Sequence, residues 1–375
     1  MSTAASTRWG RRSVSETVLL TGATGFLGME ILARLIERDD IEVICLVRAA
    51  SRDAARQRLR GVYAQLYDDP PPGIARVGVV TGDVSVDGLA LGGAEREEVL
   101  ARVTSIVHCA ASISFDLPIE TARETNSVGP LRMLELARAL ADRGRLRRHI
   151  HVSTAYVAGR YHGHFRESDL DLGQGFRNTY EQSKFAGEKA IVEAAGDLPL
   201  VVARPSIVVG DSRTGWTPVF NVIYWPLRAF SRGLMDEVPV DPQGVADIVS
   251  IDYVASALIA LLELDAANGT FHLVAGSSAL TNRELIELAC REFDRPPPRL
   301  VADGSSTPDQ ASVYLPYFGI EATLDDDRAR ALLEPLGIGA VPLRDYFPRI
   351  IEYAERSNWG KRAVTRQAAE LRTPA

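Results

Sequence analysis

The sequence predicts an α/β fold built on a doubly wound parallel sheet, followed by a smaller, mostly helical region towards the carboxyl terminus. Over the first 210 residues, short apolar runs alternate with helical patterns at the spacing of strand–helix–strand units. Several of these runs are apolar at almost every position, as expected of strands with both faces buried. A glycine-rich turn joins the first run to the first helical pattern. Together these observations favour a parallel sheet with helices on both sides.

Six expected strands follow one another in this part of the chain. They are the apolar runs at residues 17–21, 42–47, 77–81, 105–108, 149–153 and 200–204. Helical patterns lie between them at residues 26–38, 51–66, 94–101, 118–143 and 180–195. A turn rich in proline and glycine at residues 70–73 separates the second helix from the third strand. Strand-like runs return at residues 248–251 and 270–274.

The regular alternation of strands and helices stops after about residue 210, and this sets the expected division into regions. We expect a cofactor-binding domain over residues 14–210, with strands returning from about 246–275. Residues 211–245 and 276–360 are expected to form a substrate-binding region. The polar ends, residues 1–13 and 361–375, are expected to be disordered.

Composition excludes several classes of protein. The net charge of −7, with no basic stripe, argues against a nucleic-acid partner. No run reaches 18 uninterrupted apolar residues, so no membrane span is expected. The polar start MSTAASTRWGRRS lacks the apolar stretch of a secretory signal, which indicates a cytoplasmic protein. The three cysteines suggest neither a disulfide framework nor a metal site, and the oligomeric state stays open.

The first strand runs directly into the sequence TGATGFLG, residues 21–28. Glycines spaced in this way permit a tight turn, a close backbone approach to a pyrophosphate, and close packing of helix on strand. The start of the helix then offers free N–H groups to the phosphates. The motif predicts a Rossmann-type dinucleotide site made by Gly22, Thr24, Gly25, Phe26, Leu27 and Gly28. The alternative is a purely structural glycine turn.

The end of the second strand distinguishes between nicotinamide cofactors. An acid there would bind the ribose 2′-hydroxyl, whereas an arginine accommodates a 2′-phosphate. Arg48 stands at this point and no acid follows until Asp53, so the sequence favours NADPH, with Arg58 as a second phosphate contact. In so arginine-rich a chain, both arginines could instead be ordinary surface charges. Asp83 and Val84, after the third strand, are expected near the adenine, although Asp83 could be a cap or turn residue.

A tyrosine and a lysine four residues apart form a second motif. Only three lysines occur beside 39 arginines, and Lys184 follows Tyr180 by one helical turn. A cation beside a phenol favours the phenolate, so we expect Lys184 to lower the pKa of Tyr180 towards the working pH. The alternative is an incidental pair on a solvated helix face.

The chain resembles the extended short-chain dehydrogenase/reductase superfamily, and within it the thioester reductase and fatty acyl-CoA reductase group with the "male sterility" type of NAD-binding domain. The likeness covers residues 17–276, in the order of the family. Its segments are TGATGFLG, ICLVRA, TGDV, VHCAASISF, HVSTAYVAG, NTYEQSKFAGE, RPSIVVGDSRTG, DIVSIDYVA and TFHLVAG.

The resemblance implies roles for individual residues. Tyr180 would be the general acid, and Lys184 would hold the nicotinamide ribose. Thr154 would share the substrate carbonyl oxygen with Tyr180, whereas strand alternation turns its neighbour Ser153 to the other face. Asn126 would support the site from a neighbouring helix, unless it is an ordinary helix cap. Residues expected beside the cofactor are Ala110, Ala111, Pro205 and Ser206.

The function implied is NADPH-dependent reduction of an acyl thioester, carried by coenzyme A or by a separate carrier protein. Hydride transfer would give a hemithioacetal that collapses to aldehyde and thiol, and a second transfer would give the alcohol. Acyl identity and the number of transfers stay open. Alternatives are reduction of a ketone, aldehyde or secondary alcohol of a small metabolite, a sugar-nucleotide epimerase, which Arg48 disfavours, and a non-catalytic dinucleotide binder.

The substrate side is less defined. Residues 216–230 carry five aromatic side chains, which would line a tunnel for an acyl chain or pack as a buried helix. The sequence leaves these two interpretations open.

Overall fold

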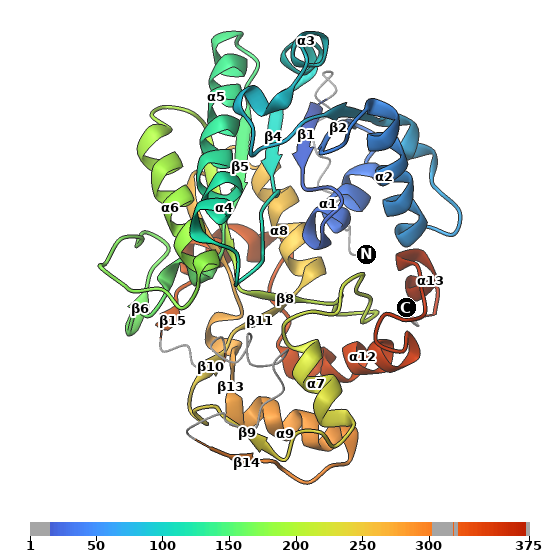
Figure 1. Cartoon of the computed structure of the whole chain (residues 1–375), viewed down its shortest axis with the longest axis vertical. Helices are drawn as coiled ribbons and strands as arrows, with labels where there is room; N and C mark the ends of the chain where they lie inside the picture. Colours follow the sequence, from blue (N-terminus) through green and yellow to red (C-terminus); the bar gives the residue numbers. More distant parts are fainter. Residues whose placement is uncertain (1–15, 302–317, 319–321, 373–375) are drawn as a thin grey trace, which may run out of the picture.

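A seven-stranded sheet forms the centre of the protein in the computed structural model, which describes residues 16–301, 318 and 322–372 (Figure 1). From edge to edge its strands are β12 (Gly269–Leu273), β7 (Leu200–Pro205), β5 (Arg148–Val152), β4 (Ser105–His108), β1 (Glu16–Thr21), β2 (Ile41–Val47) and β3 (Val77–Thr81). Every neighbouring pair is parallel. The chain winds outward from β1 in both directions, which confirms the predicted doubly wound, Rossmann-type order.

Helices cover both faces of this sheet. The helices on one face are α1 (Phe26–Ile36), α2 (Arg52–Leu66) and α8 (Ile251–Glu263). Those on the other are α3 (Gly93–Arg102), α5 (Gly129–Asp142) and α6 (Thr179–Ala194). Alternation along β1 explains the two layers, because Val18 packs with the first group and Leu19 with the second.

The single helix expected at residues 118–143 is interrupted. It divides into α4 (Ile119–Arg123), a π-helical turn (Glu124–Val128) and α5. The backbone of α6 lies directly against the turn, since a Cβ on Gly187 would stand 2.0 Å from the carbonyl oxygen of Asn126. One wide turn therefore sets the position of Asn126 and the approach of α6. Such turns are frequent at functional sites.

A smaller lobe lies beyond the carboxyl ends of the sheet strands (Figure 1). Its short strands pair as β8 (Ile207–Val209) with β11 (Ile248–Ser250), β10 (Val245–Ala246) with β13 (Leu280–Thr281), β9 (Glu237–Val238) with β14 (Arg299–Leu300), and β6 (Gly163–Phe165) with β15 (Ala322–Leu324). Its helices are α7 (Tyr224–Ser231), α9 (Asn282–Phe293) and α12 (Leu343–Arg356), whereas α11 (Asp327–Leu333) packs beside β12 at the edge of the main sheet. It has an apolar core of its own, to which Tyr156 and Phe165 also contribute.

A buried ion pair fixes α6 against the sheet. Glu188 of α6 accepts hydrogen bonds from both Nε (2.9 Å) and Nη2 (2.5 Å) of Arg204 on β7. Its other oxygen accepts a hydrogen bond from Ser153 Oγ, 2.5 Å away. Ser153, just after β5, thus contacts α6. The pair joins β5, α6 and β7 at one point.

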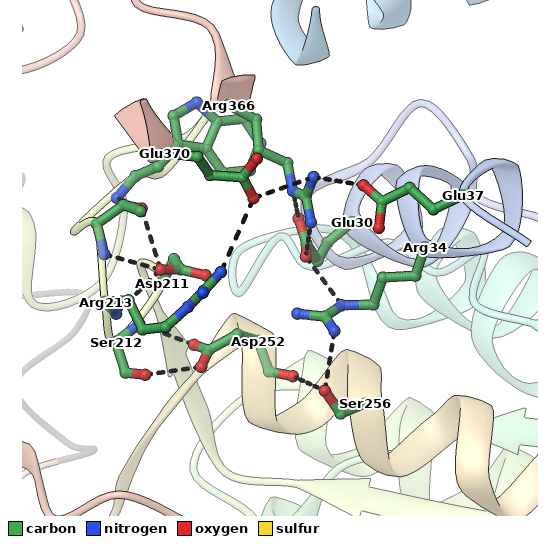
Figure 2. A network of polar contacts seen from close by, with 12 residues as sticks. Glu30, Arg34, Glu37, Asp211, Ser212, Arg213, Asp252, Ser256, Arg366 and Glu370 are labelled. Atoms are coloured by element: carbon green, nitrogen blue, oxygen red, sulfur yellow. Dashed lines mark hydrogen bonds and ion pairs between the residues drawn. The ribbon is translucent and has the colours of Figure 1, made fainter. Parts of the chain in front are cut away.

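The expectation of disorder over residues 361–375 is wrong for residues 361–372. They include α13 (Arg366–Glu370), whose Arg366 is buried against α1 (Figure 2). Its guanidinium pairs with Glu30 (2.8 Å) and Glu37 (2.8 Å), carboxylates that stand 336 and 329 residues away in sequence. Because the paired residues are so far apart in sequence, no local sequence pattern predicts this contact. The expected disorder of residues 1–13 lies outside the described residues. In the described part of the chain, no helix combines the length and apolarity needed to cross a membrane.

We expect Arg366→Ala to lower the free energy of unfolding by on the order of 3 kcal/mol near pH 7, because it leaves the buried Glu30 with Arg34 as its remaining partner. Burial already raises the pKa of Glu30 above its usual value. An acid with a raised folded pKa binds more protons when folded, so the loss should shrink as the pH falls through that pKa. Urea unfolding at several pH values measures this. Arg56→Ala, which removes an exposed ion pair with Asp53, should change little.

Candidate active site

A cleft opens at the carboxyl ends of β1, β4, β5 and β7, with an empty volume of about 1320 Å³ that includes space open to solvent. Such strand ends are where doubly wound folds bind their ligands. The predicted site residues in its wall are Gly22, Gly25, Phe26, Leu27, Gly28, Ala111, Thr154, Tyr180, Lys184, Pro205 and Ser206. The predicted residues outside its wall are Thr24, Arg48, Arg58, Asp83, Val84, Ala110 and Asn126.

The glycine turn is shaped by two close contacts. Gly22 has a φ of +77°, and a Cβ there would lie 2.8 Å from the backbone nitrogen of Ala110. A Cβ on Gly28 would lie 2.0 Å from the carbonyl oxygen of Gly22. A side chain at either position would push α1 or the loop after β4 away from β1.

The start of α1 faces the cleft with its first N–H groups. Gly25 is the N-cap and has no side chain to bond them, and Phe26, Leu27 and Gly28 line the cleft. Free N–H groups and the positive end of the helix dipole suit an anion. These residues therefore fit the pyrophosphate of a dinucleotide.

Two arginines stand at the outer edge of the glycine turn. The guanidinium of Arg58 donates hydrogen bonds to the carbonyl oxygen of Arg48 and to Thr24 Oγ1 (3.3 Å). Both arginine side chains are exposed. The nearest acid in sequence, Asp53, pairs with Arg56 at 3.0 Å. The structure thus brings Arg48 and Arg58 together beside the turn.

Asp83 makes its hydrogen bonds within the turn that follows β3. Its Oδ1 accepts hydrogen bonds from the backbone nitrogen (2.9 Å) and the hydroxyl (2.6 Å) of Ser85. Val84 is buried in the sheet core. The alternative of a turn residue therefore describes Asp83 well, and its contact with adenine stays a prediction.

Asn126 holds the loop after β4 against α6. Its Oδ1 accepts from the backbone nitrogen of Ser112 (2.8 Å), and its Nδ2 donates to the Ser112 carbonyl (2.9 Å) and to Ser183 Oγ (3.0 Å). These contacts span the loop and the helix that carries Tyr180. Asn126 lies within the π-helical turn and is not a helix cap. Its geometry is that of a positioning residue.

Tyr180 and Thr154 meet in the cleft. Asn178 caps α6 by accepting a hydrogen bond from the Glu181 nitrogen (2.9 Å), which fixes the start of the helix at Thr179, next to Tyr180. The hydroxyls of Tyr180 and Thr154 both lie in the wall of the cleft, close enough for Thr154 to lower the pKa of the tyrosine. The ring of Phe115 packs edge-on against the tyrosine, with centroids 5.6 Å apart. Two hydroxyls therefore converge on one point of the wall.

The expected effect of Lys184 on Tyr180 is wrong in this structure. Burial raises the pKa of Tyr180 to about 12, the hydroxyl of Thr154 opposes that rise, and Lys184 is not among the groups that act on it. Lys184 is itself buried and donates to the carbonyl oxygen of Val152 at 2.8 Å. Burial lowers its pKa to about 8. The desolvation of both groups outweighs their proximity on one helix face.

Several residues that line the cleft were not predicted from the sequence as site residues. The loop after β4 contributes Cys109, Ile113 and Phe115, and the segment before α7 contributes Asn221 and Val222. Cys109, Ile113 and Phe115 all lie within the segment VHCAASISF, which belongs to the family resemblance, so that resemblance could have identified them.

Val222 has a φ of +48°, unusual for a β-branched residue and costing on the order of 1–3 kcal/mol. No sequence pattern marks it. Asp247, buried beside Ser206, accepts from the nitrogens of Ala275 (2.8 Å) and Gly276 (3.1 Å). In the sequence, the feature that could have identified Asp247 is an acid directly before the strand-like run IVSI.

The aromatic segment at residues 216–230 mainly supports the core. Trp216 is buried and its Nε1 donates to the Val364 carbonyl (3.1 Å). Tyr224 is buried and its hydroxyl accepts from the Gly210 nitrogen (2.9 Å). Neither lies in the wall of the cleft. Core packing therefore describes these two aromatics better than a tunnel does.

Comparison with known sequences identifies relatives. The profile of the family described as male sterility protein matches residues 20–258. An Aspergillus flavus protein named nonribosomal peptide synthetase asaC is 34% identical over 278 residues, which cover 70% of this chain and 26% of that protein. A Drosophila melanogaster protein named fatty acyl-CoA reductase wat is 27% identical over 280 residues, covering 65% of this chain and 53% of that protein. The chain thus spans between a quarter and about half of these two relatives.

Solved structures agree on the fold. The terminal R domain from the myxalamid PKS-NRPS biosynthetic pathway has a TM-score of 0.79 at 24% identity, covering 94% of this chain and 93% of that chain. A thiolation-reductase di-domain from an archaeal non-ribosomal peptide synthetase has a TM-score of 0.76 at 19% identity, covering 92% and 76%. The family profile matches well over half of the chain, in the region that carries the glycine turn and the cleft. The chain therefore belongs to the male sterility protein family of NAD-binding domains.

Proposed function

We propose that this protein is an NADPH-dependent reductase that converts an acyl thioester, carried by coenzyme A or by a separate carrier protein, to an aldehyde. The observation that carries the proposal is the meeting of the Tyr180 and Thr154 hydroxyls in a cleft that begins at the glycine turn. The names of the relatives, a fatty acyl-CoA reductase and a nonribosomal peptide synthetase, support the thioester as substrate. The cytoplasmic location stays a prediction.

The two hydroxyls act on the carbonyl oxygen of the substrate. The bound dinucleotide supplies the hydride that reaches the carbonyl carbon. Tyr180, with its pKa raised to about 12, is protonated at neutral pH and can donate a proton to the oxygen as negative charge builds there. Thr154 holds the same oxygen by a hydrogen bond, and the partly buried setting strengthens both contacts.

Lys184 holds the cofactor end of the site. An ammonium group has three N–H donors, and one of them is used by the carbonyl of Val152. The others can bind the hydroxyls of the nicotinamide ribose from beneath Tyr180. This task needs the cation, which a pKa of about 8 retains at neutral pH.

Arg48 and Arg58 select the phosphorylated cofactor. The bonds from Arg58 to the backbone of Arg48 and to Thr24 hold the guanidinium of Arg58 beside the glycine turn, and the exposed side chain of Arg48 is free to join it at a bound phosphate. A 2′-phosphate there would gain charge-assisted hydrogen bonds that a ribose hydroxyl cannot make.

We expect Tyr180→Phe to lower kcat roughly 100- to 10,000-fold, because the variant has no proton to donate. The dissociation constant for NADPH, measured by fluorescence titration, should stay within about twofold of wild type. Tyr63→Phe, which changes a tyrosine on α2 outside the cleft, should leave both quantities unchanged. Full turnover by Tyr180→Phe would exclude the proposed proton donor.

We expect Arg48→Ala to raise the KM for NADPH roughly 10- to 100-fold, the equivalent of one lost charge-assisted hydrogen bond. The KM for NADH, which has no 2′-phosphate, should hardly change. Arg56→Ala serves as the matched control, since Arg56 is also exposed and pairs with Asp53. If neither Arg48→Ala nor Arg58→Ala altered the preference for NADPH over NADH, these residues would not select the cofactor.

We expect kcat/KM for NADPH to fall as the pH rises through about 8. Burial lowers the pKa of Lys184 from 10.5, so the free enzyme loses this cation within the measurable range. Because kcat/KM reports ionisations of the free enzyme, initial rates from pH 6 to 10 test the shift directly. A profile that stayed flat through pH 9 would contradict it.

The substrate class is tested by following NADPH oxidation with acyl-CoAs, carrier-bound acyl thioesters, aldehydes and ketones. Turnover of thioesters with release of aldehyde supports the proposal, and product analysis counts the hydride transfers. Turnover of ketones alone would replace the thioester with another carbonyl at the same two hydroxyls.

A further inference from the structure

The loop between β4 and α4 is fixed against the start of α6 at two points (Figure 1). At the first, Ser112 shares two hydrogen bonds with Asn126, one from its nitrogen (2.8 Å) and one to its carbonyl oxygen (2.9 Å). At the second, the hydroxyl of Thr179 donates to the carbonyl oxygen of Phe115 at 3.2 Å. Thr179 is the first residue of α6 and directly precedes Tyr180. These two contacts set where the loop lies relative to the proposed proton donor.

The ring of Phe115 packs against the ring of Tyr180. The ring centroids are 5.6 Å apart and the ring planes are inclined by 75°, an edge-to-face arrangement that aromatic pairs favour. Both side chains line the catalytic cleft. Phe115 also packs on the apolar core of the smaller lobe, so its ring is supported by a second contact. The phenol of Tyr180 therefore has an apolar ring, in place of water, along one of its sides.

Exclusion of water is the largest influence on the protonation of Tyr180. The polar and titratable side chains around the phenol are Thr154 and Tyr156 after β5, Cys109 after β4, and Glu181 and Lys184 on α6. Of these, Thr154 lowers the pKa of the phenol, whereas Glu181 and Cys109 raise it. Burial raises that pKa more than any of them. The side chain in ring contact with the phenol is therefore placed to control it.

We propose that Phe115 is a positioning residue that shields Tyr180 from water, so that the phenol keeps the proton it gives to the substrate. This inference rests on the proposed reductase function. A general acid must still carry its proton when negative charge builds on the carbonyl oxygen. Water beside a phenol stabilises the phenolate, and an apolar ring in the same place does not. Phe115 thus acts through Tyr180 and takes no part in the proton transfer itself.

The first experiment titrates Tyr180 without turnover. The near-ultraviolet absorbance of phenolate is followed from pH 8 to 11, and subtracting the titration of Tyr180→Phe isolates this one tyrosine. For the wild-type chain the difference should stay near zero, because burial raises the pKa of Tyr180 to about 12. The same difference is then taken between Phe115→Ala and the double variant Phe115→Ala/Tyr180→Phe. There the phenolate should appear with a midpoint roughly one to two pH units lower, since water reaches the phenol.

The second experiment measures the effect of the shield on catalysis. With saturating NADPH, kcat/KM for the butanoyl thioester of N-acetylcysteamine reports ionisations of the enzyme–NADPH complex. The ratio of the values at pH 10.5 and pH 7.5 removes any loss of activity that does not depend on pH. For Phe115→Ala this ratio should be roughly two- to fourfold below that of wild type, because more of Tyr180 has lost its proton at pH 10.5. Ionisation of Lys184 enters both ratios alike.

Three further variants separate shielding from a structural role. Phe115→Met keeps an apolar side chain of similar volume, so it should restore the wild-type titration and pH ratio. Phe176→Ala is the matched control, since Phe176 is also half-buried and packs against the ring of Phe185 (4.9 Å) outside the wall of the cleft. It should leave both measurements unchanged. If Phe115→Ala fails to fold by circular dichroism, Phe115→Val makes a smaller truncation, for which we expect the same direction of change.

The outcomes separate this inference from the function on which it rests. If wild type reduces no thioester, the proposed function fails, and the absorbance titration alone decides whether Phe115 shields Tyr180. If the two difference titrations coincide, Phe115 is not a shield, although the reductase function stands. An unchanged pH ratio in Phe115→Ala would exclude a role for the shield in the reaction. A shift in Phe115→Met as large as that in Phe115→Ala would show that an apolar side chain is not what protects the phenol.

Discussion

The close approach of Gly22 to the loop after β4 is the constraint on which the site depends. β1 and β4 are neighbours at the point where the sheet reverses its winding, and a Cβ on Gly22 would meet the Ala110 nitrogen at 2.8 Å. A side chain there would displace this loop, and with it the two bonds between Ser112 and Asn126, which itself donates to Ser183 on α6. The cofactor turn and the catalytic helix are thus coupled through one contact between backbones.

The catalytic half of the cleft is held by buried polar contacts. Asn126, the ion pair between Glu188 and Arg204, and the bond from Lys184 to Val152 each join α6 to a different neighbour. Buried polar groups with good partners are costly to rearrange, so they hold α6 in a single position. Burial also affects the protonation of the two catalytic candidates, because it raises the pKa of Tyr180 and lowers that of Lys184. Tyr180 is thereby suited to give a proton at neutral pH.

The smaller lobe contributes to the catalytic cleft through the segment before α7. Asn221 and Val222 of this segment line the cleft, and Val222 has a φ of +48°. Trp216 and Tyr224, whose sequence pattern also fitted a tunnel lining, instead pack in the core, where each makes a hydrogen bond to the backbone of another segment. The core of this lobe therefore holds the part of the chain that completes the cleft.

The sequence by itself determined the positions of the strands along the chain, the glycine turn, the arginines beside it and the common helix face of Tyr180 and Lys184. Each of these depends on residues within a few positions of one another, or on a pattern that repeats along the chain. The tertiary structure alone decided that Arg366 binds Glu30, that Asn126 holds the loop after β4, and that Val222 lines the cleft with a positive φ. It also decided the direction of the Tyr180 pKa. These features arise from burial and from contacts between distant segments, which no local pattern of residues records.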